Sequence, residues 1–228
     1  MTGEPATRSG EPATRSGPPA TRPPRAAVPP IPLLAAVAAA VALATLGLLG
    51  GGSAPVPAAP SVVALRVSSG HGIATGFAVA GRRVVTVAHV LDGPVTVGGR
   101  RGRVLRVDRR SDLALLSAPG VDAGAPDIAS AASDEHLRVI RLRPGSPSSL
   151  SVHVRRSIVA HVRAAGAPHS VARPALELSA RIAPGDSGAA VVSDRGALAG
   201  VVFAASRNRP DTAYAVDAMA VRHLLGPG

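Results

Sequence analysis

The stretch Ala183–Val192, with the sequence APGDSGAAVV, places a serine in a tight glycine turn directly before an apolar run. Glycine on either side of the Asp186–Ser187 pair allows backbone angles that a residue with a side chain resists. Such a turn can raise the Ser187 hydroxyl above the surface. It can also aim the N–H groups of Gly185 and Ser187 into one concavity, the arrangement that stabilises an oxyanion. We therefore expect a nucleophilic serine here, followed by a buried strand.

Two upstream motifs supply what such a serine needs, a general base and a group that orients the base. The run VVTVAH at 84–89 ends a β-branched segment on His89, and RSDLALL at 110–116 puts Asp112 directly before an apolar segment. Asp108 is a rival to Asp112, but it lies among three arginines and is expected to be an exposed ion-pair partner. A buried Asp112 could accept the Nδ1 proton of His89 and fix its tautomer.

The three motifs occur in the order His, Asp, Ser, and this order resembles that of the trypsin-like (chymotrypsin-fold) serine proteases. The likeness covers roughly residues 61–225. It implies an all-β fold of two antiparallel β-barrels, with the triad at their junction and a short C-terminal helix. It also implies that Ser187 is the nucleophile, His89 the general base and Asp112 its orienter, with the N–H groups of Gly185 and Ser187 forming the oxyanion hole.

Within this family the chain is most similar to membrane-anchored, HtrA-like proteases of high-GC bacteria, including the acid-resistance type. The segments GVVFAAS at 200–206 and TAYAV at 212–216 carry that likeness. The acid-resistance type has several membrane spans, whereas one is expected here. HtrA proteins have a PDZ domain after the protease domain, and we expect none here. HtrA relatives often carry asparagine where this chain has Asp186. A buried aspartate there needs a positive partner, either an arginine or a new N-terminus released by activation, and the sequence leaves both open.

The resemblance also locates the pocket for the substrate's P1 side chain, between residues 178–184 and 201–206. Its apolar wall would consist of four residues: Val202, Phe203, Ala204 and Ala205. Arg181 near the pocket floor would disfavour basic side chains, so we expect a protein or peptide substrate with a small or apolar P1 residue. No cofactor or metal is expected, because the histidines lack metal-ligand spacing such as HExxH.

The charge pattern excludes some functions. The net charge is +11, all 25 basic residues are arginine, and the 228 residues include two Phe, one Tyr and no Trp. Without aromatic stacking platforms or a recognised motif, we expect no nucleic-acid partner. The basic residues indicate either an ordinary solvated surface or contact with anionic lipid or cell-wall polymer. Because there is no cysteine, disulfides and thiolate metal sites are excluded.

The first sixty residues differ in composition from the rest. Residues 1–30 contain the repeat EPATRSG and predict a disordered, Pro/Arg-rich tail. Residues 31–52 are apolar and uncharged, long enough to form one transmembrane helix, and 53–60 form a linker to a protease domain at 61–228. The arginines of the tail favour a cytoplasmic N-terminus with the protease domain outside the cytoplasm. A cleaved signal peptide, which would leave a secreted protein, is the alternative.

Beyond residue 60, short β-branched runs separated by glycines predict strands, and Asp217–Leu225 predicts a closing helix capped by Asp217. The expected strands are Ser61–Val67, Gly76–Val79, Val84–Ala88, Val95–Val97, Val104–Val107, Leu113–Ser117, Leu137–Leu142, Val152–Val162, Ala175–Arg181, Ala189–Ser193, Leu198–Ala204 and Thr212–Val216. The prediction is therefore a membrane-anchored, extracytoplasmic serine endopeptidase that works through an acyl-enzyme. The alternatives are a catalytically inactive envelope binding module on the same fold and a basic protein that binds cell wall or lipid.

Overall fold

The computed structural model describes residues 62–70, 72–144, 146–163 and 169–226. These residues all belong to one compact unit, Ser53–Gly228. The predicted tail, apolar segment and linker (1–30, 31–52 and 53–60) lie outside the described residues, as does residue 61. Within the described part of the chain, no helix is both long and apolar enough to cross a membrane.

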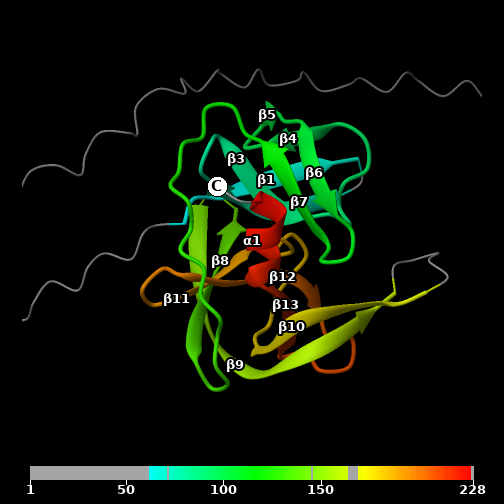
Figure 1. Ribbon diagram of the computed structural model, residues 1–228, viewed down its shortest axis with the longest axis vertical. Coiled ribbons are helices and arrows are strands. Elements are labelled where there is room, and N and C mark those ends of the chain that lie inside the picture. Colours follow the sequence, from blue (N-terminus) through cyan, green and yellow to red (C-terminus); the bar gives the residue numbers. More distant parts are fainter. Residues whose placement is uncertain (1–61, 71, 145, 164–168, 227–228) are drawn as a thin grey trace, which may run out of the picture. The chain divides into compact units, whose positions relative to one another are not determined.

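The first half of the domain forms an antiparallel sheet of seven strands (Figure 1). Its order is β5-β4-β1-β2-β3-β7-β6. The strands are β1 (Ala64–Ser69), β2 (Gly72–Val79), β3 (Arg83–Val87), β4 (Val95–Val97), β5 (Arg100–Arg101), β6 (Val104–Asp108) and β7 (Leu113–Ser117). Strands β3 and β7 lie side by side because their buried valines and leucines pair in register, with Val87 opposite Leu113.

The second half forms a closed barrel with the order β10-β13-β12-β11-β8-β9. Its strands are β8 (His136–Arg143), β9 (Ser146–Val162), β10 (Val171–Ser179), β11 (Ala190–Ser193), β12 (Leu198–Ala205) and β13 (Thr212–Asp217). β9 and β10 continue beyond the barrel as a long two-stranded ribbon (Figure 1). The all-β prediction is confirmed for the described residues.

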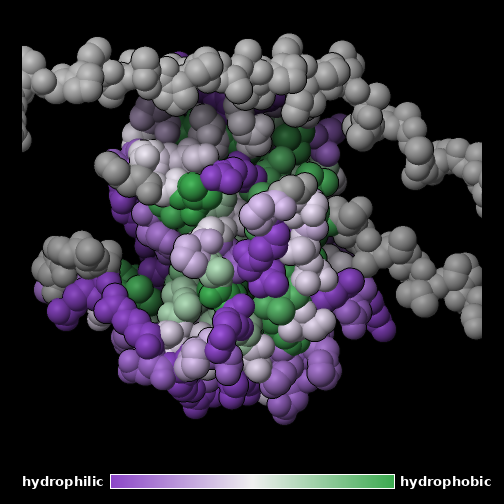
Figure 2. All heavy atoms as spheres, turned by 180° about the vertical axis from the view of Figure 1, so that it is seen from behind, coloured by the Kyte–Doolittle hydropathy of each residue, from purple (hydrophilic) through white to green (hydrophobic). Residues whose placement is uncertain are grey.

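The prediction of two antiparallel β-barrels is confirmed in part, because the second sheet closes into a barrel whereas the first sheet is open. Its edge strands β5 and β6 do not pair with each other. β5, which was not predicted, consists of two exposed arginines, and most of β6 is also exposed. The two arginines of β5 discourage further pairing at that edge of the sheet. The lower margin of the face shown in Figure 2 is largely hydrophilic.

The apolar run that follows the serine turn is buried on both sides. Val191 packs in the interior of the barrel, whereas Ala190 and Val192 join a second core with residues of the first sheet. Because successive side chains of a strand point to opposite faces, each face of β11 has a core to fill. This explains why the run is apolar throughout. Burial of both faces of β11 also anchors the serine turn between the two sheets.

The C-terminal helix α1 (Met219–Leu225) buries Val221 and Leu224 in the core that also contains residues of the first sheet. It begins two residues later than predicted. The Asp217 carboxylate does accept the N–H of Met219 at 2.7 Å. At the other end, Arg106 of β6 donates from Nη1 to the carbonyl of Leu224 at 2.8 Å, satisfying a free helix carbonyl.

Candidate active site

His89 and Asp112 meet because their strands pair. His89 lies two residues after Val87 of β3, and Asp112 immediately precedes Leu113 of β7, its paired position. The backbone N–H of His89 donates to Asp112 Oδ1 at 2.9 Å, and His89 Nδ1 lies 2.7 Å from Asp112 Oδ2. The backbone of Asp112 adopts a left-handed conformation, φ 59°, which aspartate tolerates better than most residues.

This pairing sets the tautomer of the histidine. An ionised carboxylate can only accept a hydrogen bond, so in the neutral imidazole of His89 the proton lies on Nδ1 and Nε2 keeps its lone pair. The His89 side chain is 44% exposed and that of Asp112 12%. The ring is therefore open to an approaching group while its orienting carboxylate is largely covered.

Asp108, the rival carboxylate, has different partners. Its Oδ1 accepts the N–H groups of Arg110 at 2.9 Å and Ser111 at 3.1 Å. Partial burial raises the pKa of Asp108, but the hydrogen bonds from Ser111 and Arg110 and the charge of Arg173 outweigh it, so the pKa lies below its ordinary value. Asp108 thus shapes the loop before β7 rather than bonding to His89.

Arg173 of β10, which was not predicted from the sequence, reaches the same carboxylate. Its Nη1 lies 3.4 Å from Asp112 Oδ2, and its guanidinium lies over the ring of Phe203, 5.2 Å from the centroid. Arg173 is 5% exposed. No short sequence motif indicates Arg173, because this residue belongs to β10 in the other half of the domain.

The serine turn is held by threonines of the first sheet. The N–H of Thr75 on β2 donates to the carbonyl of Ser187 at 2.8 Å, and Thr75 Oγ1 donates to the carbonyl of Gly185 at 2.7 Å. Thr86 of β3 in turn donates from Oγ1 to the carbonyl of Thr75 at 2.8 Å. A short chain of hydrogen bonds thus joins the serine turn to the strand that ends at His89. Among the described residues, no hydrogen bond joins the Ser187 hydroxyl to His89 itself.

The backbone of the turn depends on glycine. Gly185 and Gly188 have φ values of 92° and 85°, a region that other residues avoid. At Gly188 a Cβ atom would lie 1.9 Å from the carbonyl oxygen of Thr75, so the close approach of the two sheets requires glycine. Within the described part of the chain, the N–H groups of Gly185 and Ser187 have no hydrogen-bond partner.

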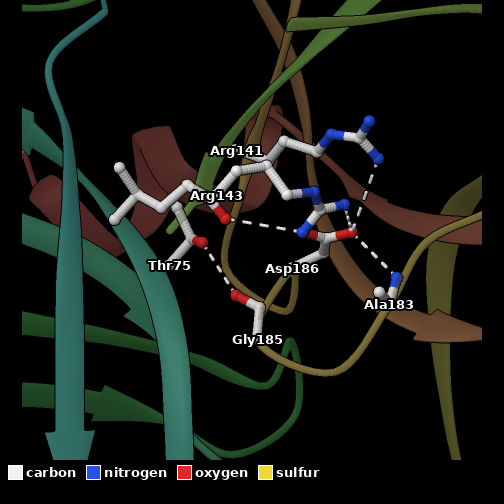
Figure 3. Close-up of polar contacts among 7 residues, drawn as sticks. Thr75, Arg141, Arg143, Ala183, Gly185 and Asp186 are labelled. Atoms are coloured by element: carbon white, nitrogen blue, oxygen red, sulfur yellow. Dashed lines mark hydrogen bonds and ion pairs between the residues drawn. The ribbon is translucent and has the colours of Figure 1, made fainter. Parts of the chain in front are cut away.

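Asp186 has an internal partner, which answers a question that the sequence left open. Its fully buried carboxylate receives two hydrogen bonds from Arg143, the last residue of β8, at 2.8 and 2.9 Å (Figure 3). Arg141 Nη1 lies 3.8 Å away, and the N–H of Ala183 donates to Oδ2 at 2.8 Å. The two-pronged guanidinium contact fixes both charge and orientation.

The predicted substrate-binding residues occupy different environments. Val202 is buried in the barrel, and its carbonyl accepts the N–H of Gly188 at 2.7 Å. Phe203 and Ala204 line a cavity of about 410 Å³ together with His89 and Asp112, while Ala205 is exposed. Arg181 lies at the surface, where its side chain is 73% exposed and its Nε lies 3.3 Å from Asp211 Oδ1.

The chain resembles a known protein family and several solved structures. The family model for the trypsin-like peptidase domain matches residues 74–201. Among solved structures, the active form of the Rv3671c protease from M. tuberculosis is 27% identical, with a TM-score of 0.65, covering 74% of this chain and 80% of that chain. A search of curated proteins found no match.

More distant structures share the fold. The MamO protease domain from Magnetospirillum magneticum is 18% identical, with a TM-score of 0.60, covering 75% of this chain and 99% of that chain. A serine endoprotease from Yersinia pestis is 15% identical, with a TM-score of 0.58, covering 73% of this chain and 62% of that chain. The match to the family model covers more than half of the chain, and the chain therefore belongs to the trypsin-like peptidases, as a serine endopeptidase of that family.

Proposed function

We propose that this protein cleaves peptide bonds with Ser187 as nucleophile, His89 as general base and Asp112 as the group that orients the histidine. The observation that carries the proposal is the 2.7 Å contact between His89 Nδ1 and Asp112 Oδ2, on a strand tied by hydrogen bonds to the serine turn. A histidine fixed in this way presents Nε2 to an incoming hydroxyl.

The reaction follows from these positions. As the Ser187 oxygen bonds to the substrate carbonyl carbon, its proton passes to Nε2 of His89. The imidazolium then gives that proton to the departing amine, which leaves an acyl-enzyme. Water then attacks the carbonyl carbon of the ester while it gives a proton to Nε2 of His89. The imidazolium returns this proton to the Ser187 oxygen as the acid product leaves.

The oxyanion formed at each stage needs donors that are not already engaged. The N–H groups of Gly185 and Ser187 fit this role because neither has a partner in the described part of the chain. The carbonyl of Gly185, which lies between the two donors along the chain, accepts a hydrogen bond from Thr75 Oγ1, and this contact limits the freedom of the turn that carries both. Donors fixed before the reaction stabilise the charge with little reorganisation.

The first experiment is labelling of the full chain with a fluorophosphonate, which reacts with activated serines. We expect labelling of the parent and none of the Ser187→Ala variant. Ser157→Ala, at an exposed serine of β9, is the matched control and should label like the parent. A folded parent that does not label would instead favour the inactive binding module.

We also propose that residues 31–52 anchor the enzyme in a membrane, with residues 1–30 in the cytoplasm and the protease domain outside. The support is the uncharged apolar run and the arginines that precede it. Protease added to intact cells should then degrade the catalytic domain while sparing a tag at the N-terminus. Release of the domain into the medium without residues 31–52 would point to a cleaved signal peptide.

Contact with anionic lipid or cell-wall polymer remains a prediction from the net charge of +11. If charge drives such binding, it weakens as salt screens the arginines. Sedimentation of the full chain with anionic and neutral vesicles at low and high salt tests this. Equal binding to both kinds of vesicle would leave the apolar segment as the sole membrane contact.

A further inference from the structure

A buried arginine faces the carboxylate that orients the proposed base. Arg173 Nη1 is 3.4 Å from Asp112 Oδ2, the same oxygen that lies 2.7 Å from His89 Nδ1. Two positive or potentially positive groups therefore share one oxygen. The guanidinium also lies over the ring of Phe203, so its position is constrained from a second side.

This buried arginine leaves hydrogen-bond donors open. Its Nε and Nη1 are buried, and within the described part of the chain neither has a hydrogen-bond partner. Burying a guanidinium with open donors is costly. Buried polar groups that lower the stability of the fold in this way occur most often at functional sites, where they are needed for the chemistry.

The other charged groups at this place come from three segments. Asp108 and Asp112 belong to the end of β6 and the loop after it, and Arg173 contributes to the lowered pKa of Asp108. Arg109, from the same loop, and His169, just before β10, line the cavity beside His89. Arg173 is thus the buried positive charge opposite two carboxylates, while Arg109 and His169 are exposed.

We propose that Arg173 is a positioning residue that offsets the charge of Asp112, so that His89 stays unprotonated at Nε2 in more acidic solution. This inference rests on the proposed function. Without Arg173, the carboxylate of Asp112 would face the histidine with less compensation and would favour its imidazolium form. An imidazolium cannot accept the Ser187 proton, so the acidic limit of reactivity would move to higher pH.

The test measures the rate of fluorophosphonate labelling of the full chain from acidic to neutral pH. In Arg173→Gln we expect the midpoint of the acidic limb about one pH unit higher than in the parent. Arg173→Lys keeps the positive charge and should stay close to the parent. Arg155→Gln, at an exposed arginine of β9, is the matched control, and His169→Gln checks that this second histidine does not set the limb.

Several results would overturn the proposal. Equal midpoints in the parent and a folded Arg173→Gln would leave Arg173 a purely structural residue, and an equal shift in Arg173→Lys would show that charge is not the cause. If Arg173→Gln does not fold by circular dichroism, Arg173→Met replaces it with an unbranched apolar side chain. Loss of the fold in both would show that the arginine is retained for folding alone.

The same data separate this inference from the proposed function. A parent that does not label at any pH, although folded, contradicts the assignment of Ser187, His89 and Asp112. If labelling disappears in Ser187→Ala but the acidic limb is the same in the parent and in Arg173→Gln, only the role of Arg173 is contradicted. Labelling with the expected shift supports both.

Discussion

Asp186 adjoins the proposed nucleophile, and its ion pair with Arg143 is a second attachment of the turn beside the hydrogen bonds from Thr75. Asp186 is fully buried and receives both prongs of the Arg143 guanidinium. In Arg143→Met the carboxylate keeps the N–H of Ala183 and a distant Arg141, leaving a poorly paired buried charge. We expect a loss of about 3 kcal/mol in the free energy of unfolding and a marked fall in labelling of Ser187.

The control for this prediction is Arg101→Met, at an exposed arginine of β5. It should match the parent in urea unfolding and in labelling. Because Arg143 supplies the charge from within the chain, we also expect full labelling without prior proteolysis. Labelling that appears only after limited proteolysis would contradict this and restore activation by a new N-terminus.

The two glycines of the turn serve different purposes, and alanine at each position separates them. At Gly188 a Cβ would collide with the backbone of Thr75, whereas at Gly185 it would meet nothing within 4 Å. Gly188→Ala should therefore destabilise the domain strongly. Gly185→Ala should fold with only backbone strain, about 1–2 kcal/mol, but label slowly because the oxyanion donors shift. Gly124→Ala, at an open position, is the control, and thermal unfolding with labelling gives both readouts.

At the scale of elements, Glu177 joins two strands of the barrel and the loop between β12 and β13. This buried residue of β10 lies 3.1 Å from Arg156 of β9 and 2.8 Å from Arg209, which precedes β13. The hydrogen bond from Arg209 lowers the pKa of Glu177, burial opposes it, and Arg156 lowers it further. The same bond raises the pKa of Arg209.

The sign of the pH effect follows from the lowered pKa. The ionised carboxylate stabilises the fold above the unfolded value of about 4.5, and this contribution is lost as the pH falls through the lower folded pKa. The free energy of unfolding of Glu177→Gln should be about 2 kcal/mol lower than that of the parent at neutral pH. This difference from the parent should become smaller at acidic pH. Urea unfolding at both pH values, with the exposed Asp122→Asn as control, measures this. A deficit that is constant with pH would contradict the assignment.

The sequence predicted site residues where strand pairing brings neighbours together. His89 and Asp112 each adjoin a β-branched or apolar run that predicts a strand, and the pairing of these strands in the structure, β3 with β7, brings the two residues together. Arg143 and Arg173 could not be found in this way. Each lies in a strand rich in arginine or of mixed polarity, and its role depends on a contact with a segment far away in the chain. A sequence motif reflects contacts between residues that are close in the chain. A charged residue that contacts the site from a distant strand does not form part of such a motif.

At the scale of the whole domain, most strand positions could be predicted from β-branched runs separated by glycines, but the closure of the sheets could not. β7 has its predicted bounds, whereas β9 begins six residues earlier than predicted, at Ser146. Residues 146–151 are mostly serines, which carry no apolar period. Whether a sheet closes depends on how its two edge strands meet, and neither the arginines of β5 nor the exposed β6 specifies that.

The larger of the two cores combines residues from the first sheet, the barrel and the helix, such as Val85, Val201 and Leu224. Neither sheet can therefore lose its packing alone, and we expect the domain to unfold in one transition. Leu224→Ala should lower the free energy of unfolding by about 2–4 kcal/mol. Leu225→Ala, at a half-buried neighbour, should cost less.

The single tyrosine of the chain, Tyr214 in β13, provides the measurement. Its fluorescence reports on the barrel, while far-UV circular dichroism reports on both sheets. Urea unfolding of the full chain should give the same midpoint by both methods in the parent and in Leu224→Ala, with both midpoints lowered together. If the circular dichroism of Leu224→Ala fell first while Tyr214 kept its native signal, the first sheet would be unfolding independently. The core seen here would then not couple the two halves on which His89 and Ser187 lie.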